Sequence, residues 1–176
     1  IARFKGSRIG QLGTRPQLFE SQNWNEQVLQ KRFGQMVVPV DLDEVLTTIE
    51  GIDIESSEVR RLSAEIPESA CVEENGEADL YNLARCEIGF KMIAKELDLQ
   101  AMAINCWTRV QERLGVSVCA IIGRLNEADM PTACEVDVYG AETMLAVHSA
   151  ALGVAKPHFI DWTDLHPDRK NTWLAW

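Results

Sequence analysis

Short apolar runs alternate along this chain with segments whose apolar residues recur every three to four positions. The first kind predicts buried strands and the second predicts amphipathic helices. We expect strands at residues 7–12, 36–40, 99–104, 132–138 and 158–162, and helices at residues 23–33, 41–50, 55–66, 78–97, 107–114, 116–125 and 140–152. Strands that alternate with helices form mainly parallel sheets with helices on both faces. The pattern therefore predicts one three-layer, Rossmann-like α/β domain over residues 1–176.

Charge and cysteine content narrow the class of protein. Seventeen basic and 27 acidic side chains give a net charge of −10, which disfavours nucleic acid or an anionic membrane as partner. No apolar run reaches the roughly 18 residues of a membrane span, and no signal peptide opens the sequence. The five cysteines are widely spaced and lack zinc-ligand spacing, which is typical of reduced thiols in a cytoplasmic protein. The chain begins at Ile1 and stops at Trp176, and we expect it to be a fragment of a longer protein.

Three early glycines, Gly6, Gly10 and Gly13, raise the possibility of a nucleotide site after the first strand. Asp41, at the end of the second expected strand, stands where a ribose-binding acid would be. The glycine spacing is not G-x-G-x-x-G, so a strand-to-loop turn in an unrelated α/β domain is the favoured interpretation. A non-catalytic nucleotide- or sugar-binding module that uses Gly13 and Arg15 stays open as the alternative.

Acidic side chains end the last two expected strands. Strand 132–138 would carry Glu135 and Asp137 on one face, and strand 158–162 contains Asp161 near its end. If these parallel strands are neighbours, about 4.8 Å apart, Glu135 and Asp161 could reach one cation. Two carboxylates suit Mn²⁺ or Mg²⁺ better than zinc. The alternative is that such acids are solvated, or that Asp137 caps the following helix.

The segment after the expected strand at 99–104 holds a third candidate. Asn105 could hydrogen-bond a hydroxyl-rich ligand at the same sheet edge, where α/β proteins bind their ligands. Cys106 has no basic neighbour in sequence to activate it, so we expect a buried thiol rather than a nucleophile. We expect His148, on the helix at 140–152, to be a packed or surface residue.

The runs TACEVDVYGAETM and HFIDWTD resemble the middle of the L-fucose isomerase family, which is related to L-arabinose isomerase. The earlier pieces SRIGQLGTRPQLF, MVVPVDLDEV and INCW fit the second domain of that family in order. The resemblance is most specific at residues 133–135, Asp137, residues 140–141 and residues 159–162, and looser elsewhere.

The resemblance implies a ketol isomerase that interconverts an aldose and its ketose through an ene-diolate with a bound Mn²⁺. Glu135 and Asp161 take the positions of the acids that hold the metal and move the proton, and Asn105 is the candidate for a sugar-hydroxyl contact. The third ligand would be a histidine from a C-terminal domain that this chain lacks. The family also implies a homo-oligomer, commonly a hexamer, so we expect this chain alone to bind metal weakly and to be inactive.

Overall fold

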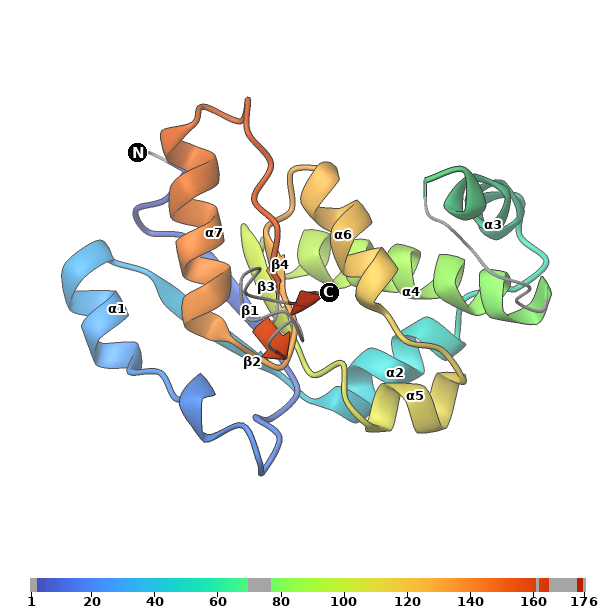
Figure 1. Cartoon of the computed structure of the whole chain (residues 1–176), viewed down its shortest axis with the longest axis horizontal. Helices are drawn as coiled ribbons and strands as arrows, with labels where there is room; N and C mark the ends of the chain where they lie inside the picture. Colours follow the sequence, from blue (N-terminus) through green and yellow to red (C-terminus); the bar gives the residue numbers. More distant parts are fainter. Residues whose placement is uncertain (1–2, 70–76, 161, 165–173, 176) are drawn as a thin grey trace.

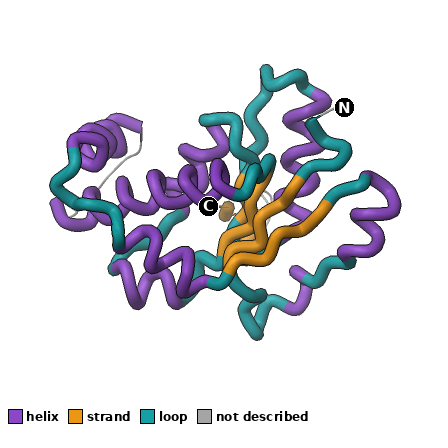
Figure 2. The backbone as a smooth tube through the Cα atoms, turned by 180° about the vertical axis from the view of Figure 1, so that it is seen from behind, coloured by secondary structure: helices purple, strands orange, loops and turns teal. Residues whose placement is uncertain are grey.

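The computed structural model describes residues 3–69, 77–160, 162–164 and 174–175. Its centre is a parallel four-stranded sheet of order β2-β1-β3-β4. The strands are β1 (Arg8–Leu12), β2 (Met36–Val40), β3 (Ala101–Ile104) and β4 (Thr132–Ala133). Figure 2 shows them side by side between the two sets of helices. The predicted α/β class with a Rossmann-like, mainly parallel sheet is confirmed.

Helices cover both faces of the sheet (Figure 1). One face carries α1 (Glu26–Phe33) and α7 (Val138–Ala150). The other carries α2 (Leu42–Glu50), α4 (Glu77–Glu96) and α6 (Cys119–Glu127), while α3 (Ser57–Ser69) packs against α4 and α5 (Arg109–Leu114) against α2. Side chains of a strand alternate between faces, so Ala103 packs with the first set and Ile104 with the second. Each layer therefore has its own apolar core. None of the described helices is long and apolar enough to cross a membrane.

Local sequence explains the first half of the fold. The Asn25 side chain accepts a hydrogen bond from the Val28 N–H at the start of α1, and Gly34 ends this helix with φ 71°. Asp41 caps α2 in the same way. Pro39 is tolerated because β2 is an edge strand, where one missing donor leaves no partner unpaired.

The predicted ends of α3 and of the strand at 132–138 are wrong. Helix α3 continues past its expected end at residue 66 to Ser69 and contains Pro67. Strand β4 stops at Ala133 instead of running to residue 138, because Glu135 and Val136 take left-handed backbone conformations with φ 57° and 59°.

The predicted fifth strand at 158–162 does not join the parallel sheet. The described residues 158–160 have no regular structure. Strand β5 (Trp162–Asp164) instead pairs antiparallel with β6 (Leu174–Ala175) in a separate two-stranded sheet. Phe159 packs against the core under α7, where a Cβ on Gly140 would lie 2.7 Å from its Cε2 atom.

Candidate functional site

A crevice of about 430 Å³ opens at the carboxyl edge of the sheet. Its lining includes Gly13 after β1, Asp41 after β2, Asn105 after β3 and Arg109 at the start of α5. The chain passes from β1 to β2 on one side and then returns to β3 on the other side of β1. Open α/β sheets bind their ligands at such a reversal of strand order. The crevice is therefore the first place to look for a ligand site.

Asn105 lies at the floor of this crevice and is only 7% exposed. Its backbone N–H donates to the Leu12 carbonyl at 2.9 Å, and its Nδ2 donates to the Thr14 carbonyl at 2.7 Å. The Oδ1 atom is buried, and none of the described residues donates a hydrogen bond to it. A buried acceptor without a donor costs about 1–3 kcal/mol. Oδ1 is therefore suited to accept a hydrogen bond from a ligand hydroxyl, the contact predicted for Asn105.

Gly13 brings the loop after β1 against Asn105. Its φ is +92°, and a Cβ there would lie 2.8 Å from the Cβ of Asn105. Its N–H donates to the Val40 carbonyl at 2.9 Å, so it also joins the ends of β1 and β2. Asp41, the predicted ribose ligand of the nucleotide alternative, uses Oδ1 to accept from the Asp43 N–H at 2.7 Å as a helix cap. Both residues thus have clear structural roles.

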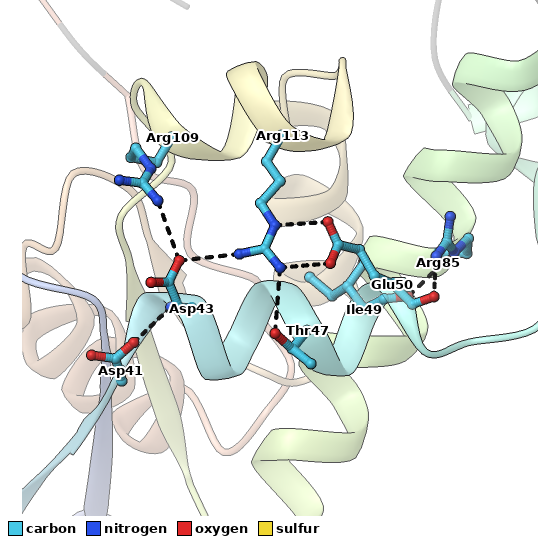
Figure 3. Close-up of polar contacts among 8 residues, drawn as sticks. All are labelled: Asp41, Asp43, Thr47, Ile49, Glu50, Arg85, Arg109 and Arg113. Carbon is cyan, nitrogen blue, oxygen red and sulfur yellow. Dashed lines mark hydrogen bonds and ion pairs between the residues drawn. The ribbon is translucent and has the colours of Figure 1, made fainter.

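Arginines hold α5 against α2 beside the crevice (Figure 3). Arg113 makes a two-pronged contact with Glu50, from Nε at 2.8 Å and from Nη2 at 2.7 Å, and this contact lowers the pKa of Glu50. Arg109 and Arg113 both reach Asp43 Oδ1, at 3.2 Å and 3.1 Å. Arg85 of α4 donates to the Glu50 carbonyl at 2.5 Å. The network fixes α5, and with it the position of Arg109 at the rim.

Glu135 lies just beyond β4 and is partly buried. The next N–H, that of Val136, donates to the Ile104 carbonyl at 3.1 Å and so extends the pairing of β3 with the chain after β4. Glu135 and Asn105 therefore come from the ends of neighbouring strands. The prediction that Asp137 shares a strand face with Glu135 is wrong, because β4 ends at Ala133. The Asp137 Oδ1 atom accepts from the Gly140 N–H at 2.8 Å and caps α7. The alternative role considered for Asp137 is confirmed.

The second predicted metal ligand, Asp161, lies outside the described residues, and the parallel strand expected to carry it is not formed. Within the described part of the chain, no three His, Cys, Asp or Glu side chains group as metal ligands. The Glu135–Asp161 cation site therefore stays a prediction. His148 is only 2% exposed, with its Nε2 atom 3.2 Å from Asp129 Oδ1, near the far end of α7. It is a packed residue, as expected.

Cys106 is buried, as predicted, but it belongs to a cluster that the sequence pattern did not reveal. A hydrogen bond with the Cys134 side chain, which outweighs burial, and one from the Glu135 backbone N–H lower the pKa of Cys106 to about 7. The sequence did hold a signal for this contact, because Cys106 follows β3 and Cys134 follows β4, and these two strands are neighbours in the sheet. The cluster ties the end of β3 to the turn that carries Glu135.

Comparison with known proteins gives relatives of one kind, although no family model matches the chain. The chain is 25% identical over 183 aligned positions to a sulfoquinovose isomerase of Alkalicoccus urumqiensis. This alignment covers 100% of the chain and 39% of the relative. Sulfoquinovose isomerases of Priestia aryabhattai and Priestia megaterium are each 25% identical over 171 positions, covering 96% of this chain and 37% of the relative. The chain thus spans about two fifths of the length of these curated relatives. It is similar, over nearly its whole length, to proteins named as sugar isomerases.

Proposed function

We propose that this chain is the α/β domain of an aldose–ketose isomerase and that Asn105 and Glu135 contact its sugar substrate. One observation carries the proposal: these two side chains follow neighbouring strands at the ligand-binding edge of a sheet, in a chain similar throughout to sulfoquinovose isomerases. Sulfoquinovose, the sugar in the names of the relatives, is the first substrate to test.

The residues suit the chemistry of such a reaction. Interconversion of an aldose and a ketose moves a proton between two adjacent carbons, and a carboxylate can take the proton from one and return it to the other. We assign this proton transfer to Glu135, with Asp161 as the second acid by resemblance. Asn105 would hold a sugar hydroxyl through its unpaired Oδ1 atom, which positions the sugar across the strand ends.

The resemblance further implies Mn²⁺, or another divalent cation, as cofactor. The donor type agrees with it, since carboxylates such as that of Glu135 are the hard oxygen ligands that such ions take. We propose that Glu135 and Asp161 hold the cation, which when bound would polarise the sugar carbonyl. We propose that the complete protein has a further region, corresponding to the part of the relatives that this chain does not span. That region would supply the remaining metal ligands, the rest of the pocket and the contacts of a homo-oligomer.

The test uses the complete gene product, Mn²⁺ and a panel of aldoses that includes sulfoquinovose. Glu135→Gln should lower kcat about 10²- to 10⁴-fold, the usual contribution of a general base, while Asn105→Ala should mainly raise KM. Glu44→Gln, on the exposed face of α2, is the matched control and should leave both constants unchanged. Full activity in Glu135→Gln, or no isomerisation of any sugar, would overturn the proposal. Sugar binding that survives Glu135→Gln without any turnover by the wild type would favour the non-catalytic binding module.

A further inference from the structure

Two cysteines meet at the carboxyl edge of the sheet, next to the residues proposed to contact the sugar. Cys106 comes two residues after β3, and Cys134 directly follows β4, the strand that pairs with β3. Neighbouring strands lie about 4.8 Å apart, so side chains that follow them can touch. The two side chains do so through a hydrogen bond between their sulfur atoms. The structure therefore holds two reduced thiols in direct contact.

The pair differs in exposure from two other cysteines of the described chain. Cys106 is 9% exposed and Cys134 is partly buried, so the pair borders the solvent. Cys86, on α4, is 0% exposed. Cys119, at the start of α6, is exposed. A small oxidant can therefore reach the pair but not Cys86.

The turn that carries Glu135 depends on the same two cysteines. Glu135 and Val136 have left-handed backbone conformations, with φ 57° and 59°, which are unfavourable for residues with a Cβ and most of all for a branched one. Such conformations persist only where surrounding contacts enforce them. The Glu135 N–H donates to the Cys106 sulfur, and the Asp137 N–H donates to the Cys134 carbonyl at 3.0 Å. A change at the two sulfurs therefore reaches Glu135 directly.

We propose that Cys106 and Cys134 are a redox modification site, which a peroxide closes to a disulfide, and that the closed form blocks proton transfer by Glu135. The first part rests on the contact between the two thiols. The second part rests on the proposed isomerase function and adds a form of regulation to it.

The reaction balances with hydrogen peroxide as the oxidant. One sulfur attacks the peroxide, the O–O bond breaks, and the thiol proton leaves with the departing hydroxide as water, which yields a sulfenic acid. The second sulfur attacks the sulfenic sulfur, the S–S bond forms, the S–O bond breaks, and the hydroxyl leaves with the second thiol proton as water. Two thiols thus lose two electrons and two protons, and the peroxide is reduced to two molecules of water. Because the sulfurs are already in contact, the second step needs no large movement.

Closure changes the turn because a covalent S–S bond is shorter than a hydrogen bond between two sulfurs. The Cys106 sulfur moves toward Cys134 and away from the Glu135 N–H, so one of the contacts that enforce the left-handed turn is lost. The Glu135 carboxylate then shifts from its place at the sheet edge. A misplacement of about 1 Å at a reacting group can cost about 10²-fold in rate, and we expect kcat of the closed form to fall by about this factor.

Peptide mass mapping of the complete protein, without metal or sugar, tests the modification site. The native protein is treated with a series of hydrogen peroxide concentrations, blocked with iodoacetamide and digested. We expect a peptide pair linked through Cys106 and Cys134, lighter by two hydrogens than the reduced pair, which dithiothreitol separates. Cys86 should stay a thiol, and Cys119→Ser, the matched control, should leave the yield of the link unchanged. Sulfinic acids without a link, or two unmodified thiols, would overturn the inference.

Turnover of a sugar by the complete protein, measured after catalase has removed the peroxide, tests the effect on Glu135. The fraction of activity lost should follow the fraction of linked protein, and dithiothreitol should restore both. Cys134→Ser and Cys106→Ser cannot form the link, and each should lose less activity than the wild type when compared with its own untreated form. Two variants are used so that the result does not depend on the folding of one. Full activity of the linked protein, or an equal loss in both variants, would overturn the inference.

The two measurements separate this inference from the proposed function. A link that forms in a protein that isomerises no sugar would support the modification site and overturn the isomerase assignment. An active isomerase in which no link forms would overturn the modification site alone.

Discussion

The contact between α4 and α6 offers the sharpest test of how this fold is held together. Glu87 of α4 is only 2% exposed. Its Oε2 accepts from Arg124 Nε of α6 at 2.6 Å, and its Oε1 accepts from Lys91 Nζ at 2.5 Å. Burial alone would raise the pKa of Glu87, but the hydrogen bonds from Arg124 and Lys91 outweigh it and hold the pKa below its usual 4.5. The carboxylate is therefore stabilised in its charged form.

We predict that Glu87→Gln destabilises the chain by about 2 kcal/mol at pH 7. Each hydrogen bond to a charged group contributes about 1.5–3 kcal/mol. The amide keeps one acceptor oxygen and avoids the cost of burying a charge, so less than the sum of two such bonds is lost. Folding lowers the pKa of Glu87, so the charged carboxylate adds to the free energy of unfolding. The wild type is therefore more stable than Glu87→Gln by the full amount well above pH 4.5, and this difference is lost as the pH falls through the folded pKa.

Urea unfolding followed by tryptophan fluorescence at pH 7 and at pH 4 measures both effects. The matched control is Glu65→Gln, because Glu65 also approaches Arg124, at 3.8 Å, but is 41% exposed. Exposed pairs contribute little, so this control should change the free energy of unfolding by less than about 1 kcal/mol. A Glu87→Gln effect no larger than that of the control, or one that is equal at the two pH values, would refute the reasoning.

Three further substitutions test the site and its surroundings. Gly13→Ala should cost about 1–3 kcal/mol in urea unfolding, because its Cβ would crowd Asn105 and its φ is +92°; a neutral effect would contradict the close approach. Asp137→Ala should cost about 1 kcal/mol through loss of the α7 cap, and an unchanged midpoint would contradict it. Cys134→Ala should raise the pKa of Cys106 from about 7, because the largest cause of its lowering is removed. Peptide-resolved alkylation over a pH series measures this shift, and an unmoved midpoint would argue against the contact.

Local signals predicted the elements that depend on neighbouring residues in the chain. The helix expected at 23–33 ends at Phe33, as α1 does, because the left-handed Gly34 that stops it acts within one turn. The alternation of residues 132–138 was misleading, since a period of two is also compatible with a short strand followed by an irregular turn. Only the backbone at Glu135, with its positive φ, shows where β4 ends.

The candidate site divides in the same way. The position of Asn105 at the carboxyl edge of the sheet could be predicted from its place after a strand, because α/β sheets bind ligands at the carboxyl ends of their parallel strands. That Arg15 and Arg109 line the same hollow could not be predicted, because it depends on the pairing of β1 with β3, which lie far apart in the chain.

By itself, then, the sequence determined the class of fold and the order of the helices and of the first four strands along the chain, since these follow from periodicity and local hydrogen bonds. The tertiary structure decided the order of the strands within the sheet, the end of β4, the unpaired oxygen of Asn105 and the convergence of Gly13, Asp41 and Asn105 on one crevice. These arise only when distant segments pack together, and no local pattern encodes which segments will meet.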